Sequence, residues 1–102
     1  MDALSLTVYD VDGTRIIQAK GEIDMATAPQ LAAVLAQCGV TSVCVDLTDV
    51  TFMDSSGLGV LLRAHKRAAE RNVELMIANA APNVMKVLEI TNLDHVLNCE
   101  PV

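Results

Sequence analysis

An apolar run at Val43–Leu47 lies between two segments with helical periodicity, and this order limits the fold more than any other feature of the sequence. Before the run, apolar residues recur at i, i+3, i+4 and i+7, which is typical of one helix face; they are Leu31, Val34, Leu35 and Cys38. The segment after the run begins near Asp54 or Ser55 and is again helical. A strand between two helices pairs in parallel with its neighbours through right-handed crossovers. The order therefore predicts an α/β fold with Val43–Leu47 as a buried central strand.

The first twenty residues predict a β-hairpin. Residues Leu4–Asp10 alternate between apolar and polar side chains, which is the period of a half-buried strand. Asp12-Gly13 has the composition of a two-residue hairpin turn, and Arg15–Lys20 supplies the returning strand. The sheet is therefore expected to be mixed, with an antiparallel pair at its start.

The remaining segments complete the order β-β-α-β-α-β-α-β. We expect a loop at Gly21–Ala26, a capping box of Thr27 and Gln30, a connection at Thr48–Met53, a strand at Val73–Ala78, a short helix at Asn83–Ile90 and a last edge strand at Val96–Cys99. The second helix is expected to bury a stripe of Leu58, Leu61, Leu62, His65, Ala68 and Ala69. The predicted fold is a single domain over residues 1–102, with a mixed sheet of four to five strands and about three helices packed on it.

Composition and charge exclude several classes of function. The formal net charge is −6, and the chain has one Tyr, one Phe and no Trp, which argues against a nucleic-acid binder. No apolar stretch has the length needed to span a bilayer, so we expect no membrane segment. Cys38, Cys44 and Cys99 have no metal-binding spacing, and their odd number without a signal peptide predicts reduced thiols in the cytoplasm.

Four of the seven basic residues gather in one stretch, at Arg63, Lys66, Arg67 and Arg71. One interpretation is a solvated helix face whose cations suit the C-terminal half of the helix. The other is a local contact patch for an acidic partner. The sequence leaves both open.

The helix start at Asp54-Ser55-Ser56 is the candidate functional site. A helix N-terminus leaves backbone N–H groups unpaired and carries partial positive charge. A serine hydroxyl there is either an N-cap or an acceptor of phosphate, which the helix end favours. Gly57 and Gly59 each cost roughly 1 kcal/mol relative to alanine within a helix, and capping requires neither. The glycines indicate that another backbone, or a large partner, approaches this helix end closely.

Catalytic templates are not matched by this sequence. A nucleophile elbow, Gly-x-Ser-x-Gly, lacks its first glycine around Ser55. Gly57-Leu58-Gly59 lacks the third glycine of a dinucleotide fingerprint. His65 and His95 have no plausible set of metal ligands around them in the sequence. We therefore expect no catalytic residue, no metal and no cofactor, so that the protein is not an enzyme.

The run Asp54-Ser55-Ser56-Gly57-Leu58-Gly59, preceded by Val45-Asp46-Leu47, resembles the signature of the STAS domain. More narrowly, it resembles the bacterial anti-sigma factor antagonists, also called anti-anti-sigma factors. Gly21-Glu22-Ile23-Asp24 is similar to the Gly-Glu-Leu-Asp segment that those proteins carry before their first helix. The similarity runs over nearly the whole chain in the same element order. Family members commonly continue into a further C-terminal helix, which has no counterpart before Val102.

The resemblance implies partner switching in the regulation of transcription. In this family the unmodified antagonist binds an anti-sigma factor that is also an ATP-dependent serine kinase, and so frees the sigma factor. The kinase phosphorylates one serine of the antagonist, which ends the complex, and a PP2C-type serine phosphatase reverses the modification. Matched by position, the phosphorylated residue is Ser55, and Asp24 matches an acidic position at the kinase interface.

The expected partner-binding residues are Asp24, Met25, Asp54, Ser55, Ser56, Gly57, Leu58 and Gly59. Further apolar contacts are expected from residues near the helix start, namely Leu58, Val60 and Leu61. Phosphate on Ser55 would place a dianion beside Asp24 and Asp54, which disfavours burial against a partner arranged for a neutral hydroxyl.

Two other functions stay open. One is a non-switching STAS scaffold, as a subunit of a sensory complex or of a lipid transporter. The other is a nucleotide-binding STAS module that uses the Ser55–Gly59 helix start as an anion site. The retained serine favours switching, because a scaffold does not need a phosphate acceptor.

Overall fold

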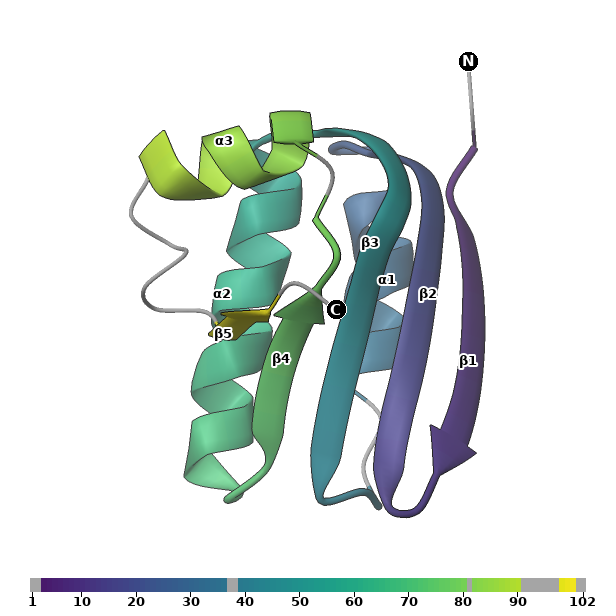
Figure 1. Cartoon of the computed structure of the whole chain (residues 1–102), viewed down its shortest axis with the longest axis vertical. Coiled ribbons are helices and arrows are strands. Elements are labelled where there is room, and N and C mark those ends of the chain that lie inside the picture. The colour runs from purple at the N-terminus through teal and green to yellow at the C-terminus, as the bar shows by residue number, and fades with distance from the viewer. Residues whose placement is uncertain (1–2, 37–38, 81, 91–97, 101–102) are drawn as a thin grey trace.

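The computed structural model describes residues 3–36, 39–80, 82–90 and 98–100, which form one mixed sheet with helices packed on it. In chain order the elements are β1 (Ser5–Val11), β2 (Thr14–Ile23), α1 (Ala28–Leu35), β3 (Ser42–Met53), α2 (Ser55–Glu70), β4 (Glu74–Ala78), α3 (Pro82–Ile90) and β5 (Asn98–Glu100). This is the predicted order of elements. Helices α1 and α2 lie behind the sheet and α3 lies across its upper end (Figure 1). Cys38, His95 and the first part of the expected strand Val96–Cys99 lie outside the described residues.

The sheet is mixed and opens with a hairpin, as predicted. Its strands lie in the order β1-β2-β3-β4-β5, with β1 antiparallel to β2 and the other pairs parallel. The turn between β1 and β2 has two residues, Asp12 and Gly13, with φ of 49° and 83°. Two consecutive residues with positive φ are characteristic of a type I′ turn, which matches the twist of the strands that it joins.

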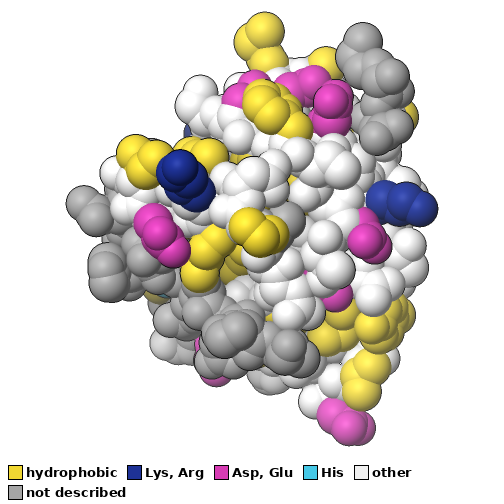
Figure 2. All heavy atoms as spheres, turned by 45° about the horizontal axis from the view of Figure 1, so that its top comes forward, with side chains coloured by type: hydrophobic (Ala, Val, Ile, Leu, Met, Phe, Trp, Pro, Cys, Tyr) yellow, Lys and Arg dark blue, Asp and Glu magenta, His cyan; other side chains and the backbone are white. Residues whose placement is uncertain are grey.

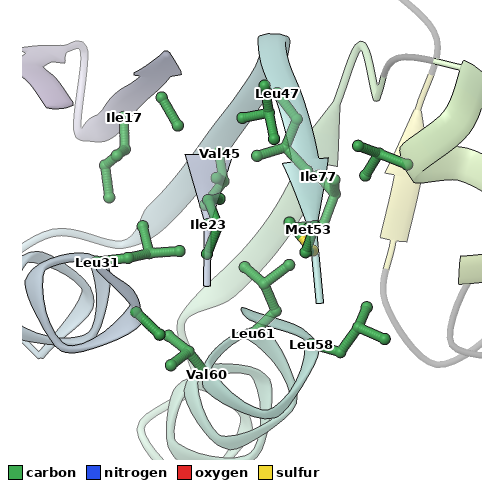
Figure 3. Packing of buried hydrophobic residues seen from close by; sticks show 14 of the residues in the cluster. Ile17, Ile23, Leu31, Val45, Leu47, Met53, Leu58, Val60, Leu61 and Ile77 are labelled. Carbon is green, nitrogen blue, oxygen red and sulfur yellow. The ribbon is translucent and has the colours of Figure 1, made fainter. Parts of the chain in front are cut away.

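The core lies between one face of the sheet and the helices α1 and α2. Alternate residues of β3 are buried over Val43–Leu47, as expected for a central strand covered on that face. Leu31 of α1 and Leu61 of α2 are both fully buried, and in Figure 3 they point toward Ile23 and Val45 of the sheet. Helices and strands share this one aliphatic cluster, so the helix starts are fixed relative to the strand ends.

Strands β2 and β3 are longer than the sequence predicts. The expected loop begins with Gly21–Ile23, which instead ends β2, and the expected connection Thr48–Met53 is the last part of β3. The loop prediction is confirmed for Asp24–Ala26 and wrong for Gly21–Ile23, and the predicted connection is wrong, because parallel pairing between the two strands continues past irregularities in register at Gln18/Lys20 and Gly21/Glu22. Pairing with a neighbouring strand supplies backbone hydrogen bonds that the local polar sequence does not indicate.

The predicted capping box at the start of α1 is also wrong. Thr27 makes no side-chain cap hydrogen bond; its hydroxyl donates to the Glu22 carbonyl at 2.9 Å and accepts from the Asp24 N–H at 2.9 Å. The Gln30 amide nitrogen donates to the Leu4 carbonyl at 3.1 Å, in the chain segment that leads into β1. Bonds of Thr27 to the preceding turn and a tertiary bond of Gln30 therefore replace the pairing that the motif suggests.

The predicted buried stripe of α2 is confirmed at Leu58 and Leu61 and is wrong for the residues that follow them. The fully buried residues are Gly57, Leu58, Val60 and Leu61, whereas Leu62, His65 and Ala68 are half-buried and Ala69 is exposed. The helix packs against α1 as well as against the sheet. Contact with α1 buries Val60, and the C-terminal half of the helix is more open than the periodicity predicts.

Gly57 packs tightly against the last residues of β2 and β3. A Cβ at this position would be 2.7 Å from Met53 Cγ and 2.8 Å from Ile23 Cγ2, distances that real Cβ atoms do not adopt. A Cβ at Gly59 would have only the Arg63 guanidinium near it, with Nη1 at 3.2 Å. Close packing within the chain thus requires a glycine at position 57, whereas position 59 opens toward solvent and a movable side chain.

Alanine at these two glycines is expected to change stability in opposite directions. We expect Gly57→Ala to lower the free energy of unfolding by about 1–3 kcal/mol, since its methyl group overpacks the contact with Met53 and Ile23. Gly59→Ala should raise it by roughly 0.5–1 kcal/mol, because alanine loses less backbone entropy in a helix. Urea denaturation of the two variants measures both values. Equal effects at both positions would contradict the close contact at Gly57.

Candidate functional site

The ends of β2 and β3 bring two connections of the chain side by side. Ile23 and Met53 are paired as the last residues of these parallel strands, and the Asp54 N–H donates to the Ile23 carbonyl at 3.1 Å. Each strand is followed at once by an aspartate, Asp24 after β2 and Asp54 after β3. Parallel strands present their carboxyl ends at one edge of the sheet, which is where α/β folds place their functional loops.

Asp24 organises the turn that leads into α1. One carboxylate oxygen, Oδ1, accepts from the Ala26 N–H at 2.9 Å and from the Thr27 N–H at 3.1 Å. The Asp24 carbonyl accepts from the Ala28 N–H at 2.7 Å. These bonds hold the turn so that Met25, at its tip, is 78% exposed. A side chain of this size has no interior packing at that exposure, so it is available to a partner.

Asp54, rather than Ser55, is the N-cap of α2. Its Oδ1 accepts from the Ser56 N–H at 2.8 Å and from the Gly57 N–H at 3.3 Å. Its backbone is extended, with φ −104° and ψ −171°, as is usual for an N-cap residue. Two N–H groups of the first turn are therefore already paired, and the partial positive charge of the helix end faces a carboxylate. Ser55, the first residue of the helix, is exposed.

A groove between the first turns of α1 and α2 gathers several of the predicted site residues. It has a volume of about 510 Å³. The lining residues are Met25, Ala28, Pro29, Ala32, Ser55, Ser56, Gly59, Val60 and Arg63. Met25, Ser55, Ser56 and Gly59 thus share one surface, with small side chains of α1 opposite the serines.

The other predicted site residues do not line this groove. Leu58 is only 7% exposed and Gly57 is buried against Met53 and Ile23, so neither offers surface to a partner. Asp24 and Asp54 are half-buried beside the groove, where their carboxylates hold backbone N–H groups. Of the further apolar contacts expected near the helix start, Leu61 is fully buried in the core, whereas Val60 belongs to the core and also lines the groove.

The sequence places Arg63 in a basic stretch without predicting that it lines the groove beside Ser55, and it does not predict the contact made by Asn83. Arg63 lines the groove because helical side chains lean toward the N-terminus, and its guanidinium lies over Gly59, one turn before it. The spacing of Gly59 and Arg63 at i and i+4 is the signal that would have shown it. Asn83, at the start of α3, donates from Nδ2 to the Thr51 carbonyl at 2.8 Å and so ties α3 to the same end of the sheet. Nothing in the local sequence indicates that contact.

The surface around this end is mixed in chemistry. In Figure 2, where this end of the molecule comes forward, hydrophobic and acidic side chains alternate with polar surface and do not form one continuous patch. Within the described part of the chain, no three His, Cys, Asp or Glu side chains lie close enough to hold a metal ion. No helix among the described residues combines the length and apolar character of a membrane span. The arrangement can present a hydroxyl and a shallow groove to another macromolecule.

Known proteins resemble this chain along nearly its whole length. The family model described as the STAS domain matches residues 5–102. The chain is 33% identical over 103 residues to the anti-sigma-B factor antagonist of Listeria monocytogenes, which covers 97% of this chain and 90% of that protein. It is 32% identical over 85 residues to the anti-sigma-B factor antagonist of Staphylococcus aureus, and the match covers 80% of this chain and 79% of that protein. The crystal structure of an anti-sigma factor antagonist from Mycobacterium paratuberculosis superposes with a TM-score of 0.87 at 28% identity, covering 98% of this chain and 87% of that one.

Substitution of Asp54 tests whether this carboxylate caps the helix. We expect Asp54→Ala to lower the free energy of unfolding by about 1 kcal/mol, within a range of 0.5–2, because two N–H groups lose their acceptor. Asp54→Asn should retain most of the stability, since the asparagine side-chain oxygen accepts the same bonds. Thermal and urea denaturation of the two variants measure the difference. Similar losses in both variants would show that charge, and not the hydrogen bonds, stabilises the helix start.

Proposed function

The chain belongs to the STAS domain family, and on this premise we propose that it is an anti-sigma factor antagonist switched by phosphorylation of Ser55. In the proposed cycle, the unphosphorylated protein binds an anti-sigma factor in the cytoplasm and so releases the sigma factor. The anti-sigma factor is also an ATP-dependent serine kinase, and its transfer of phosphate to Ser55 ends the complex. A PP2C-type serine phosphatase restores the active form. The protein itself is a substrate in this cycle and catalyses no step.

The position of Ser55 carries this proposal. Its hydroxyl is at the exposed first residue of α2 and lines the groove, while the capping role belongs to Asp54. A kinase can therefore reach the hydroxyl without disturbing a bond that holds the helix. Exposed Met25 and half-buried Ser56 and Gly59 surround it and give the partner a small, accessible surface to bind.

Phosphate at this position is expected to act on binding more than on folding. It adds about −1.5 to −2 charges and three strong acceptor oxygens to an exposed site. The N–H groups of Ser56 and Gly57 are already held by the Asp54 carboxylate, which lies directly before Ser55. The new dianion would therefore be next to an existing negative charge and would be costly to bury under a partner.

A binding experiment with matched serine variants tests the proposed function. Tagged wild type, Ser55→Ala, Ser55→Asp and Ser56→Asp are incubated with native bacterial lysate, and retained proteins are identified by mass spectrometry. We expect wild type and Ser55→Ala to retain a histidine-kinase-like ATPase, and Ser55→Asp to bind it at least tenfold more weakly because of its added charge. Ser56→Asp carries the same charge one residue away on the same binding surface, so we expect it to weaken binding less than Ser55→Asp does.

Incubation of the recovered ATPase with ATP then tests the modification. Wild type should gain one phosphate, on Ser55, and Ser55→Ala should gain none. Absence of phosphate on Ser55 would rule out the switch. Retention of the same partners by wild type and Ser55→Asp would instead favour a non-switching scaffold.

A further inference from the structure

The groove at Ser55 continues along the whole length of α1 and α2. Next to the section that holds Ser55 lies a narrow section lined by Ala32, Leu35, Val60, Arg63, Ala64 and Arg67. This section shares Ala32, Val60 and Arg63 with the section at Ser55. It also shares its other three residues with a wider hollow of about 250 Å³ at the far end of the helices. The three sections therefore adjoin as a shallow channel from Ser55 to Arg71, whose middle section has only about 30 Å³ of open space.

The floor and one lip of this channel differ in chemistry. Its floor is aliphatic; besides the residues shared between sections it includes Val40, Val43, Ala68, Val73 and Leu75. Arg63 and Arg67 line the channel from α2, at positions i and i+4 of one helix face, and Arg71 lines it as the C-cap residue directly after the helix. A chain with a net charge of −6 thus concentrates cations along one edge of an apolar channel.

We propose that this channel, which we call the α1–α2 groove, binds an acidic amphipathic helix of the protein that docks at Ser55. The inference rests on the proposed function, because it extends the binding surface of that partner from Ser55 to Arg71. Apolar side chains of the bound helix lie on the aliphatic floor, and its carboxylates pair with the arginines of the lip. This is the helix-in-groove mode of recognition, with charge complementarity fixing the register.

The spacing of the arginines selects a helix as the occupant. Residues four apart on a helix are separated by about 6 Å along its axis, since the rise is 1.5 Å per residue. A second helix lying alongside α2 with glutamate or aspartate at every fourth position repeats the same spacing. Its carboxylates then meet the guanidinium groups of Arg63 and Arg67 one by one, and arginine is well suited to such pairing because its planar group donates two parallel bonds.

The same arrangement connects the groove to phosphorylation. Ser55 and Arg63 line the same end of the groove, and the Arg63 guanidinium already leans toward that end over Gly59. A phosphate on Ser55 would repel an acidic helix and would offer Arg63 a competing anion. The modification would therefore weaken binding along the groove as well as at the serine itself.

Charge reversal at Arg67, and separately at its neighbour Lys66, tests the proposal. The probe is the ATPase that wild type retains from lysate and that Ser55→Asp releases, purified and measured by calorimetric titration. Arg67 lines the groove, whereas Lys66, its neighbour on the same helix, is exposed and is not among the residues that line it. We expect Arg67→Glu to weaken binding roughly tenfold and to make it less sensitive to salt, because an attractive contact becomes repulsive. Lys66→Glu should change affinity less than about twofold, since exposed charges outside an interface contribute little.

Each result separates this inference from the proposed function. Equal affinity of Arg67→Glu and wild type would overturn the groove proposal and leave the Ser55 switch intact. If Lys66→Glu weakened binding as much as Arg67→Glu, a general effect of net charge would replace the groove. If wild type retained no partner that depends on Ser55, the proposed function and this inference would both fail. Circular dichroism melts of both variants control for stability, because each substitution places the same charge near the end of α2.

A synthetic peptide tests the chemistry without the natural partner. A 16-residue helical peptide with glutamate at every fourth position and leucine beside it is titrated into the ¹⁵N-labelled full chain. We expect amide shifts to concentrate on the residues that line the groove, such as Ala32, Ala64 and Arg67. A twin peptide with lysine in place of glutamate should produce less than a fifth of these shifts. Equal shifts from both peptides, or shifts only on the uncovered face of the sheet, would overturn the proposal.

Discussion

The parallel pairing of β2 and β3 up to Ile23 and Met53 is the constraint on which the rest of this structure depends. The two strands end together, so the turn of Asp24 and the start of α2 meet at one edge of the sheet. The bond from the Asp54 N–H to the Ile23 carbonyl joins the two connections directly. Because of this pairing, residues thirty positions apart in the sequence form one surface.

Close packing beneath that surface separates its structural residues from its exposed ones. Gly57 and Leu58 hold α2 against the strand ends, and Asp54 holds the first turn of the helix. Ser55, Ser56 and Gly59 are then left on the outer side, next to Met25. A motif of six consecutive residues thus divides between two roles, because successive helical positions point in directions about 100° apart. Modification of Ser55 can change binding while the packing below it stays as it is.

Charged side chains are distributed unevenly along the same surface. Two aspartates flank the helix starts at one end of the α1–α2 groove, and the arginines of α2 follow its lip toward the other end. Attraction between an acidic partner and that lip is long-ranged in comparison with the contacts at Ser55, so it would orient the partner before those contacts form. A dianion at Ser55 would oppose it at the end where the hydroxyl has to be buried.

The sequence by itself determined the order of elements, the opening hairpin, the aliphatic core and the helix start at Asp54 and Ser55. These depend on local patterns, namely alternation, helical periodicity, Asp-Gly turn chemistry and a short specific motif. Only the tertiary structure decided that β2 and β3 extend to Ile23 and Met53. The last residues of each strand are extended because they pair with the neighbouring strand, and not because of their local preference. It also decided that Gly57 serves the core, that Thr27 and Gln30 bond outside their predicted motif, and that Arg63 reaches the groove at Ser55. The pairing of β2 with β3, the contact of Gly57 with Ile23 and the bond of Gln30 to Leu4 join segments distant in sequence, and no local pattern encodes such a distance. Thr27 and Arg63 instead contact residues within five positions, and there the fold selects among several possible local contacts.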